Sequence, residues 1–288
     1  MNRTGWRKGF SVASAGLLAT TVALAAGQAT ASASPGPHGN PGPSGKASDV
    51  GLHVVGLGDS VLTALDRCHC PGLLVDYAGL VADRLQERIR VENQAHGSAT
   101  SNNLLDTLRT DRVQDSIRTA DLVVLFVGAN DFTAAFNKVA HGSPARFRYA
   151  PVAEHLEHNV GESIEQIRRL NGQARIVVCG YWNDFKDGAV ARREYSADKQ
   201  HAAAQATQYT NDALYKAAQD AHVEYLSTLD LFQNKGDMTP LLAADGDHLS
   251  AAGHTLIAQA LADLLHPDEG NNNAPDAPPL DPGLSRTP

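Results

Sequence analysis

The chain has 288 residues, with 24 Lys or Arg against 32 Asp or Glu, and its formal net charge is −8. Its apolar fraction of 42% is ordinary for a globular protein, which excludes collagen, a disulfide-dense mini-protein and a wholly disordered chain. The acidic balance also argues against a nucleic-acid-binding protein, which normally carries a clustered basic face.

The N-terminal residues have the pattern of an export signal. Arg3, Arg7 and Lys8 precede an uncharged stretch, Ser11–Ala26, and the small-residue pattern Ala31-Ser32-Ala33 follows. Together these features predict a secretory signal peptide over residues 1–33 and an extracellular protein. An uncleaved membrane anchor is the alternative, but the stretch is short and weakly apolar for a span of about 20 residues. Stable membrane insertion is therefore not expected.

Proline marks two further segments, because ten of the 14 prolines lie in residues 34–48 and 267–288. The first segment is rich in Pro, Gly and Ser, which predicts a flexible linker. The second has too few large apolar side chains to offset the entropy of ordering, which predicts a disordered tail. A single globular domain is expected over residues 49–266.

Within this domain, short apolar runs alternate with segments of helical periodicity. Strands are predicted at Leu52–Leu57, Ile89–Asn93, Leu122–Val127, Arg175–Cys179 and Val223–Leu226. Helices are predicted at Leu73–Ile89, Asn102–Ile117, Val152–Leu170, Ser196–Ala221 and Ala252–Leu265. This alternation predicts an α/β fold: a parallel sheet of about five strands in a three-layer α/β/α sandwich. In such folds the functional site lies beyond the carboxyl ends of the strands.

Polar residues follow two of these strands. Gly58-Asp59-Ser60 comes after the first strand and could expose a serine hydroxyl at the edge of the sheet. Gly128-Ala129-Asn130-Asp131 follows the third strand, where an Asn amide could donate to a developing oxyanion. Gly, Asn, Asp and Ser are also common turn residues, so each motif alone fits an ordinary turn.

A third motif, Asp245-Gly246-Asp247-His248, leads into the last predicted helix. An Asp three residues before a His can hold one imidazole nitrogen while the other nitrogen faces a serine. A lone His is more often a surface residue, and the chain has 12 of them. The combination of a nucleophile, an oxyanion donor and an acid–base pair at strand ends is what favours catalysis.

In this order, the three motifs resemble those of the GDSL-type esterase/lipase family, also called SGNH hydrolases. The resemblance spans about Leu52–Leu265. The segments Tyr181–Asp184 and 245–254 are similar to the corresponding segments in a secreted actinobacterial branch of this family. It implies a flavodoxin-like sandwich and a secreted serine hydrolase of carboxylic esters that needs no cofactor. The alternative is a non-catalytic extracellular binding domain on the same fold, and a metalloenzyme is a third possibility.

The resemblance implies a Ser-His-Asp triad in which Ser60 attacks an ester carbonyl, His248 moves the proton and Asp245 orients His248. Asp247 competes for the orienting role, although its place beside His248 predicts poorer geometry. The implied oxyanion hole consists of the N–H of Ser60, the N–H of Ser98 and the amide of Asn130.

The second family motif departs from its usual form. The stretch Asn93–Thr100 reads NQAHGSAT, and alignment on its ends places Ser98 where the family has Gly. A backbone N–H can come from Ser, but Ser pays for a positive φ that Gly adopts freely. A shift of register that uses Gly97 is the alternative.

Aromatic residues near the strand ends have two interpretations. Tyr181, Trp182 and Phe185 follow the fourth strand, and Phe132 follows Asn130-Asp131. They could line an acyl or alcohol pocket, or they could pack under a loop. The substrate itself could be a lipid, a short-chain ester or an acetylated sugar. No long apolar segment suggests an interfacial lid, which favours small acyl groups, and a monomer is expected.

The three cysteines are Cys68, Cys70 and Cys179. Cys179 ends a buried strand and is expected to behave as a small apolar residue. Related secreted sequences have a similar loop, which implies a Cys68–Cys70 disulfide, with Cys70–Cys179 as the alternative. Cys68-His69-Cys70 could also be half of a metal site, but no second Cys/His pair stands at zinc spacing, so no metal site is expected.

Overall fold

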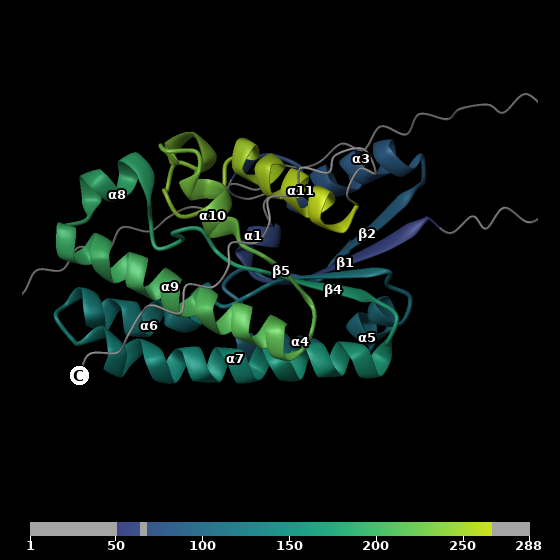
Figure 1. The fold of residues 1–288 in the computed structure, drawn as a ribbon, viewed down its shortest axis with the longest axis horizontal. Helices are drawn as coiled ribbons and strands as arrows, with labels where there is room; N and C mark the ends of the chain where they lie inside the picture. The colour runs from purple at the N-terminus through teal and green to yellow at the C-terminus, as the bar shows by residue number, and fades with distance from the viewer. Residues whose placement is uncertain (1–50, 64–67, 267–288) are drawn as a thin grey trace, which may run out of the picture. The chain divides into compact units, whose positions relative to one another are not determined.

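The computed structural model describes residues 51–63 and 68–266. The predicted signal peptide, linker and tail lie outside these residues. Five parallel strands form one sheet in the order β2-β1-β3-β4-β5 (Figure 1). The strands are β1 (Leu52–Gly58), β2 (Ile89–Asn93), β3 (Leu122–Phe126), β4 (Arg175–Cys179) and β5 (Glu224–Leu226). This order is that of flavodoxin-like folds, so the predicted fold class is confirmed.

The centre of the sheet forms where the sequence is continuously apolar. All five residues of β3 are buried, as expected for a central strand covered on both faces. The edge strand β2 is only partly buried. Strand order reverses between β1 and β3, because the chain adds β2 on one side of β1 and the later strands on the other. Ligands in open α/β sheets bind at such a reversal, beyond the carboxyl ends of the strands.

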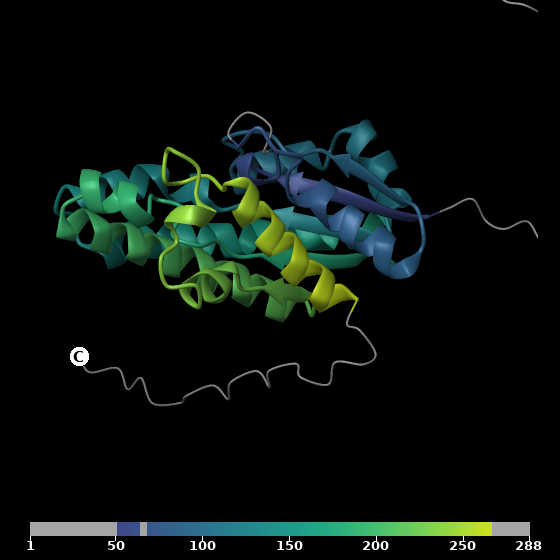
Figure 2. The same cartoon turned by 90° about the horizontal axis from the view of Figure 1, so that it is seen from above.

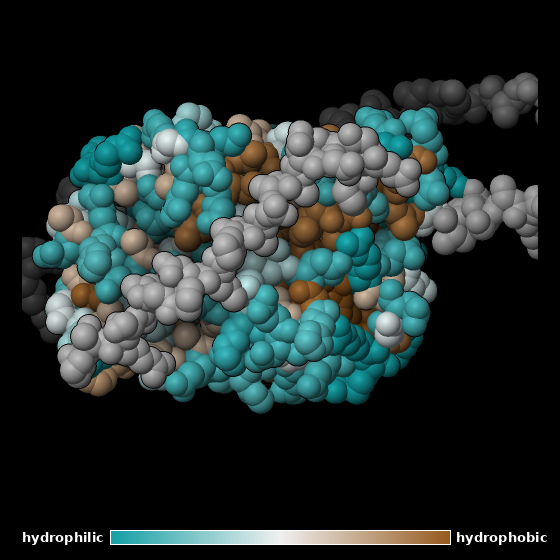
Figure 3. Space-filling model, in the orientation of Figure 1, coloured by the Kyte–Doolittle hydropathy of each residue, from teal (hydrophilic) through white to brown (hydrophobic). Residues whose placement is uncertain are grey.

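Two pairs of long helices cover the sheet. Helices α3 (Leu73–Leu85) and α11 (Ala251–Leu265) lie side by side on one face (Figures 1 and 2). Helices α7 (Ala145–Leu170) and α9 (Ala197–Asp220) contact each other on the opposite face. The inner side of α7 buries Leu156, Val160 and Ile164, whereas its outer side is hydrophilic along the lower edge of Figure 3. This division of polar and apolar side chains holds the helix against the sheet.

Shorter helices complete the described part of the chain. They are α1 (Ser60–Thr63), α4 (Ser101–Thr107), α5 (Asp111–Arg118), α6 (Ala129–Ala140), α8 (Gly188–Glu194), α10 (Thr228–Gln233) and the 3₁₀ turn Thr239–Leu241. Helices α6, α8 and α10 were not predicted from the sequence. Among the described residues, no helix is both long and apolar enough to cross a membrane.

Three predicted helix boundaries were wrong. The helix predicted over Asn102–Ile117 is two helices, because α4 ends before Leu108 and Asp111 opens α5, where an acidic residue suits a helix N-terminus. Helix α3 ends four residues early, at Leu85, because Gln86 adopts a left-handed conformation with φ 56°. Helix α7 begins at Ala145 and continues through Pro151, the residue just before its predicted start.

Candidate active site

Ser60 stands at a tight turn between β1 and α1. Gly58 has φ 143°, and a Cβ atom there would clash with the carbonyl oxygen of Phe126 on β3. Only glycine therefore allows this close approach of the two strands. The N–H of Asp59 donates to that same Phe126 oxygen at 2.9 Å. The turn places Ser60 at the carboxyl end of β1, where the strand order reverses.

Asp59 holds this turn together from inside. Its Oδ1 accepts the N–H of Val61 at 3.0 Å, and its Oδ2 accepts the hydroxyl of Tyr181 at 2.5 Å. The side chain is almost fully buried, and burial raises the pKa of Asp59 to about 6. Tyr181 follows β4, so this buried hydrogen bond links the turn after β1 to the segment after β4.

His248 faces Ser60 from the loop before α11. Its Nε2 lies 3.2 Å from Ser60 Oγ. The loop folds back on itself, with the Ala243 N–H donating to the His248 carbonyl at 2.8 Å. Ser250 then caps α11 by accepting the Gly253 N–H at 3.3 Å. The ring is thus positioned by a closed loop and a capped helix.

Two carboxylates contact the other nitrogen of this ring. His248 Nδ1 lies 2.8 Å from Asp245 Oδ2 and 2.8 Å from Asp247 Oδ1. The expectation that Asp247 would have poorer geometry was therefore wrong. Gly246, with φ 78°, reverses the chain between the two acids, and its N–H closes the turn on the Ala243 carbonyl at 3.0 Å. The reversal turns both carboxylates toward the imidazole.

These contacts shift the pKa values of His248 and Asp245. The hydrogen bond with Asp247 is the largest effect that raises the pKa of His248, and Asp245 adds to it. Burial acts to raise the pKa of Asp245, but its contacts with Asp247 and His248 prevail and hold that pKa at about 2. An imidazole between two carboxylates is stabilised in its charged form, which a general base must reach after it accepts a proton.

Asn130 is the second residue of α6 and lies beyond the end of β3. Its Nδ2 donates to the Ala99 carbonyl at 3.0 Å, which ties α6 to the loop that contains Ser98. An amide nitrogen carries two hydrogens, so a second one is left for another acceptor. Ser98 is exposed and has φ 61°, in the left-handed region, whereas Gly97 does not have a positive φ.

A cavity of about 240 Å³ opens beside Ser60. Its lining includes the site residues Asn130, Asp247 and His248, the predicted Tyr181 and Trp182, and an aromatic group formed by Phe136, Phe185 and Tyr195. The ring centroids of Phe136 and Phe185 are 4.8 Å apart. Phe132, by contrast, lies in the core 5.8 Å from the Tyr149 ring and does not line the cavity.

Two polar atoms near the cavity are buried without a hydrogen-bond partner in the described part of the chain: Trp182 Nε1 and Asp184 Oδ1. Burial, reinforced by the Asp59 carboxylate, holds the pKa of Asp184 well above its usual value. Asp184 had no predicted role, although it belongs to the segment Tyr181–Asp184 that resembles the secreted branch of the family. Phe136 and Tyr195 were missed because neither α6 nor α8, the helix just before Tyr195, was predicted.

The cysteines lie apart from this cavity. The structure joins Cys68 to Cys70 in a disulfide, with their Cα atoms 5.2 Å apart. Cys179 is a buried free thiol at the end of β4, and burial raises its pKa above the usual range. Potential metal ligands converge in two places within the described residues: the cluster of Asp245, Asp247 and His248, and a second one at the disulfide.

Solved structures share this architecture, and one curated protein matches the chain in sequence. The chain is 26% identical over 191 residues to the uncharacterized protein YpmR of Bacillus subtilis, covering 64% of this chain and 71% of that protein. A lipase from a goat rumen metagenome aligns with TM-score 0.61 at 16% identity, over 73% of this chain and 95% of the lipase. The phospholipase A1 of Streptomyces albidoflavus aligns with TM-score 0.56 at 19% identity, over 74% and 99% of the two chains.

An acetylxylan esterase from Geobacillus stearothermophilus aligns with TM-score 0.55 at 17% identity, over 76% of this chain and 97% of that one. At these identities the solved structures establish the fold alone. The sequence model of one family goes further, because it matches residues 57–256, which include Ser60, Asn130 and His248. The chain belongs to the GDSL-like lipase/acylhydrolase family.

Proposed function

We propose that this protein hydrolyses carboxylic esters through a Ser60-His248-Asp245 triad. The observation that carries the proposal is the contact of 3.2 Å between Ser60 Oγ and His248 Nε2, with a carboxylate on the opposite ring nitrogen. Ser60 Oγ attacks the ester carbonyl while His248 takes its proton. His248 then gives this proton to the leaving alcohol, and water hydrolyses the acyl-enzyme by the same path.

The tetrahedral oxyanion needs donors on the side of the carbonyl away from His248. We assign this role to the N–H groups of Ser60 and Ser98 and to the amide of Asn130. The contact of Asn130 with the Ala99 carbonyl supports the assignment, since it holds the amide beside the loop of Ser98. The left-handed conformation of Ser98 supports its use in place of the family's glycine.

We expect Asn130→Ala to lower kcat by about 10²–10³-fold, the usual effect of removing one oxyanion donor. KM should change little, because the donor acts on charge that develops in the transition state. Asn137→Ala is a matched control, since Asn137 lies on the same helix and lines the same cavity. Equal losses of kcat in the two variants would remove Asn130 from the oxyanion hole.

The cavity favours compact substrates. Its volume is about 240 Å³, below the roughly 300–1,000 Å³ that is usual for small-molecule pockets. A short acyl group or a small alcohol fits this space, and the aromatic residues Phe136, Phe185 and Tyr195 offer it an apolar wall. We therefore propose short-chain esters, with acetylated sugars among them, ahead of long-chain lipids.

A panel of p-nitrophenyl esters tests both activity and size selection. We expect kcat/KM to be highest for acetate to butyrate and at least about tenfold lower for palmitate, whose chain exceeds the cavity. A fluorophosphonate probe should label wild-type protein at Ser60. A protein that neither hydrolyses any ester nor reacts with the probe would instead be a binding domain, and a preference for palmitate would contradict the proposed size limit.

We also propose that the protein is exported and belongs to a secreted actinobacterial-type branch of the family. The support is the signal pattern in residues 1–33 and the sequences Tyr181–Asp184 and 245–254. N-terminal sequencing of protein recovered from culture medium checks the export. We expect cleavage after Ala33, which leaves Ser34 as the first residue. If all of the recovered protein still began at Met1, the proposed signal peptide would be wrong.

A further inference from the structure

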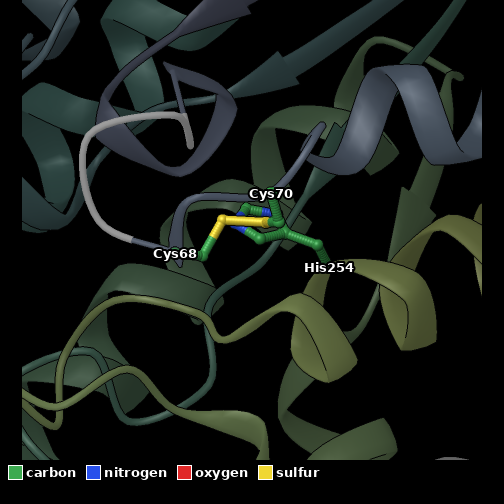
Figure 4. A group of neighbouring side chains, drawn as sticks. All are labelled: Cys68, Cys70 and His254. Atoms are coloured by element: carbon green, nitrogen blue, oxygen red, sulfur yellow. A yellow bond between two sulfur atoms is a disulfide. The ribbon is translucent and has the colours of Figure 1, made fainter.

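A second cluster of reactive side chains lies at the Cys68–Cys70 disulfide. Figure 4 shows the ring of His254, from α11, against this pair of cysteines. One atom from each residue, two sulfurs and one imidazole nitrogen, lies within 4.8 Å of the others. None of the three residues belongs to the proposed triad or lines the cavity beside Ser60.

The local backbone brings both cysteines to one side. His69, between them, has φ 52°, a left-handed conformation that turns the chain sharply. The Cα atoms of Cys68 and Cys70 are 5.2 Å apart as a result. The side chain of His69 is exposed, whereas Cys70 is buried and Cys68 is half-buried. Both sulfurs thus face the protein, and the imidazole between them in sequence is left in solvent.

His254 has the features of an unused ligand. It is only 2% exposed, and its Nδ1 has no hydrogen-bond partner among the described residues. A buried polar nitrogen normally has a partner, so its absence calls for an explanation. The disulfide does not supply one, because its sulfur atoms are weak acceptors.

We propose that reduction of the Cys68–Cys70 disulfide opens a site for one thiophilic divalent ion such as Zn²⁺. Its ligands are the two Sγ atoms and an imidazole nitrogen of His254. A dithiol reductant supplies two electrons and two protons, so that the protein's S–S bond breaks and one forms in the reductant. The ion then replaces the two thiol protons, which are released to solvent.

The dimensions fit such an ion. Bonds to zinc of about 2.3 Å for sulfur and about 2.0–2.1 Å for nitrogen separate the donor atoms by roughly 3.5 Å. After reduction the two sulfur atoms, bonded to each other in the disulfide, must move apart to roughly 3.5 Å, and the His254 nitrogen already lies within 4.8 Å of both. The site lies between the segment after Ser60 and the helix after His248, and its existence does not depend on the proposed activity.

The test uses the full chain and Co²⁺, which replaces Zn²⁺ and reports its ligands by absorption. The protein is reduced with a phosphine, because dithiols would themselves bind the ion. We expect the reduced protein to bind one Co²⁺ with thiolate-to-cobalt charge-transfer bands and tetrahedral d–d bands, and Zn²⁺ to displace it. The oxidised protein should show neither band. A reduced protein without these bands would overturn the proposal.

Variants identify the ligands. Cys68→Ser, at a half-buried position, and His254→Ala should each weaken Co²⁺ binding by more than roughly tenfold, as expected for loss of a ligand. His69→Ala is the matched control and should leave binding unchanged. If His69→Ala abolishes binding while Cys68→Ser or a folded His254→Ala retains it, the ion is held by the exposed loop and the proposed site is wrong. Circular dichroism of each variant establishes whether it folds. If His254→Ala does not fold, the Co²⁺ affinity of Cys68→Ser alone tests the proposed site.

Discussion

Replacement of Ser60 by Ala is expected to lower kcat for a short p-nitrophenyl ester by about 10⁵–10⁶-fold. Without Oγ no acyl-enzyme forms, and His248 has no hydroxyl from which to take a proton. Residual hydrolysis would come from the oxyanion donors and from substrate binding alone. The measurement is the initial rate of purified protein, with fluorophosphonate labelling as a second readout that should also be lost.

The matched control for Ser60→Ala is Ser143→Ala, in the loop between α6 and α7. This variant should keep both the rate and the labelling of the wild type. Near-normal hydrolysis by Ser60→Ala would exclude Ser60 as the nucleophile. Loss of activity in both variants would point to damage of the fold instead of the site.

The second large effect concerns the two carboxylates on His248. We expect Asp245→Asn to lower kcat/KM by about 10³–10⁴-fold, because an amide group favours the wrong imidazole tautomer. Asp247→Asn should cost about tenfold or less, even though both oxygens lie 2.8 Å from Nδ1. Asp245 uses both oxygens, since its Oδ1 accepts the N–H groups of Asp247 at 3.3 Å and His248 at 3.2 Å while its Oδ2 faces the ring. Asp247 uses one oxygen for both contacts, because its Oδ1 accepts the His248 N–H at 2.9 Å and also faces the ring.

The pH dependence of kcat/KM is an independent measure of how Asp245 and Asp247 act on His248. His248 must be neutral to accept a proton, so kcat/KM falls as pH drops through its pKa. Both carboxylates raise the pKa of His248, and removal of either negative charge should therefore move the acidic limb to lower pH. A limb that stays in place in both variants would show that neither acid interacts with the catalytic histidine. A larger loss in Asp247→Asn would transfer the orienting role to Asp247.

Much of the sheet follows from sequence because its strands are short, continuously apolar and bounded by glycine. The predicted Arg175–Cys179 is identical to β4, and Leu122–Val127 differs from β3 by one residue. Ser60 and Asn130 were proposed because they follow predicted strands, and His248 because its motif leads into the last predicted helix. The structure places all three around one cavity. Parallel topology thus converts distant positions in sequence into neighbours.

What the sequence missed depends on local backbone turns and on contacts between distant segments. Helical periodicity shows which side of a helix is buried, but it does not show whether the helix is unbroken. The break between α4 and α5 was therefore not predicted. The second carboxylate on His248 depends on the left-handed Gly246, which spacing does not reveal. The contact of His254 with Cys68 and Cys70 joins residues more than 180 positions apart, a pairing that motif spacing cannot identify.

The two partners of the proposed proton transfer lie 188 residues apart, near opposite ends of the folded domain. Ser60 follows the first strand, and His248 is held by the loop that leads into α11, the last helix. The proposed hydrolysis therefore requires α11 to be docked beside α3, although neither helix belongs to the sheet. Local detachment of α11 would take His248 away from Ser60 while the sheet stayed intact, so the activity that we propose depends on local order at this helix as well as on the fold as a whole.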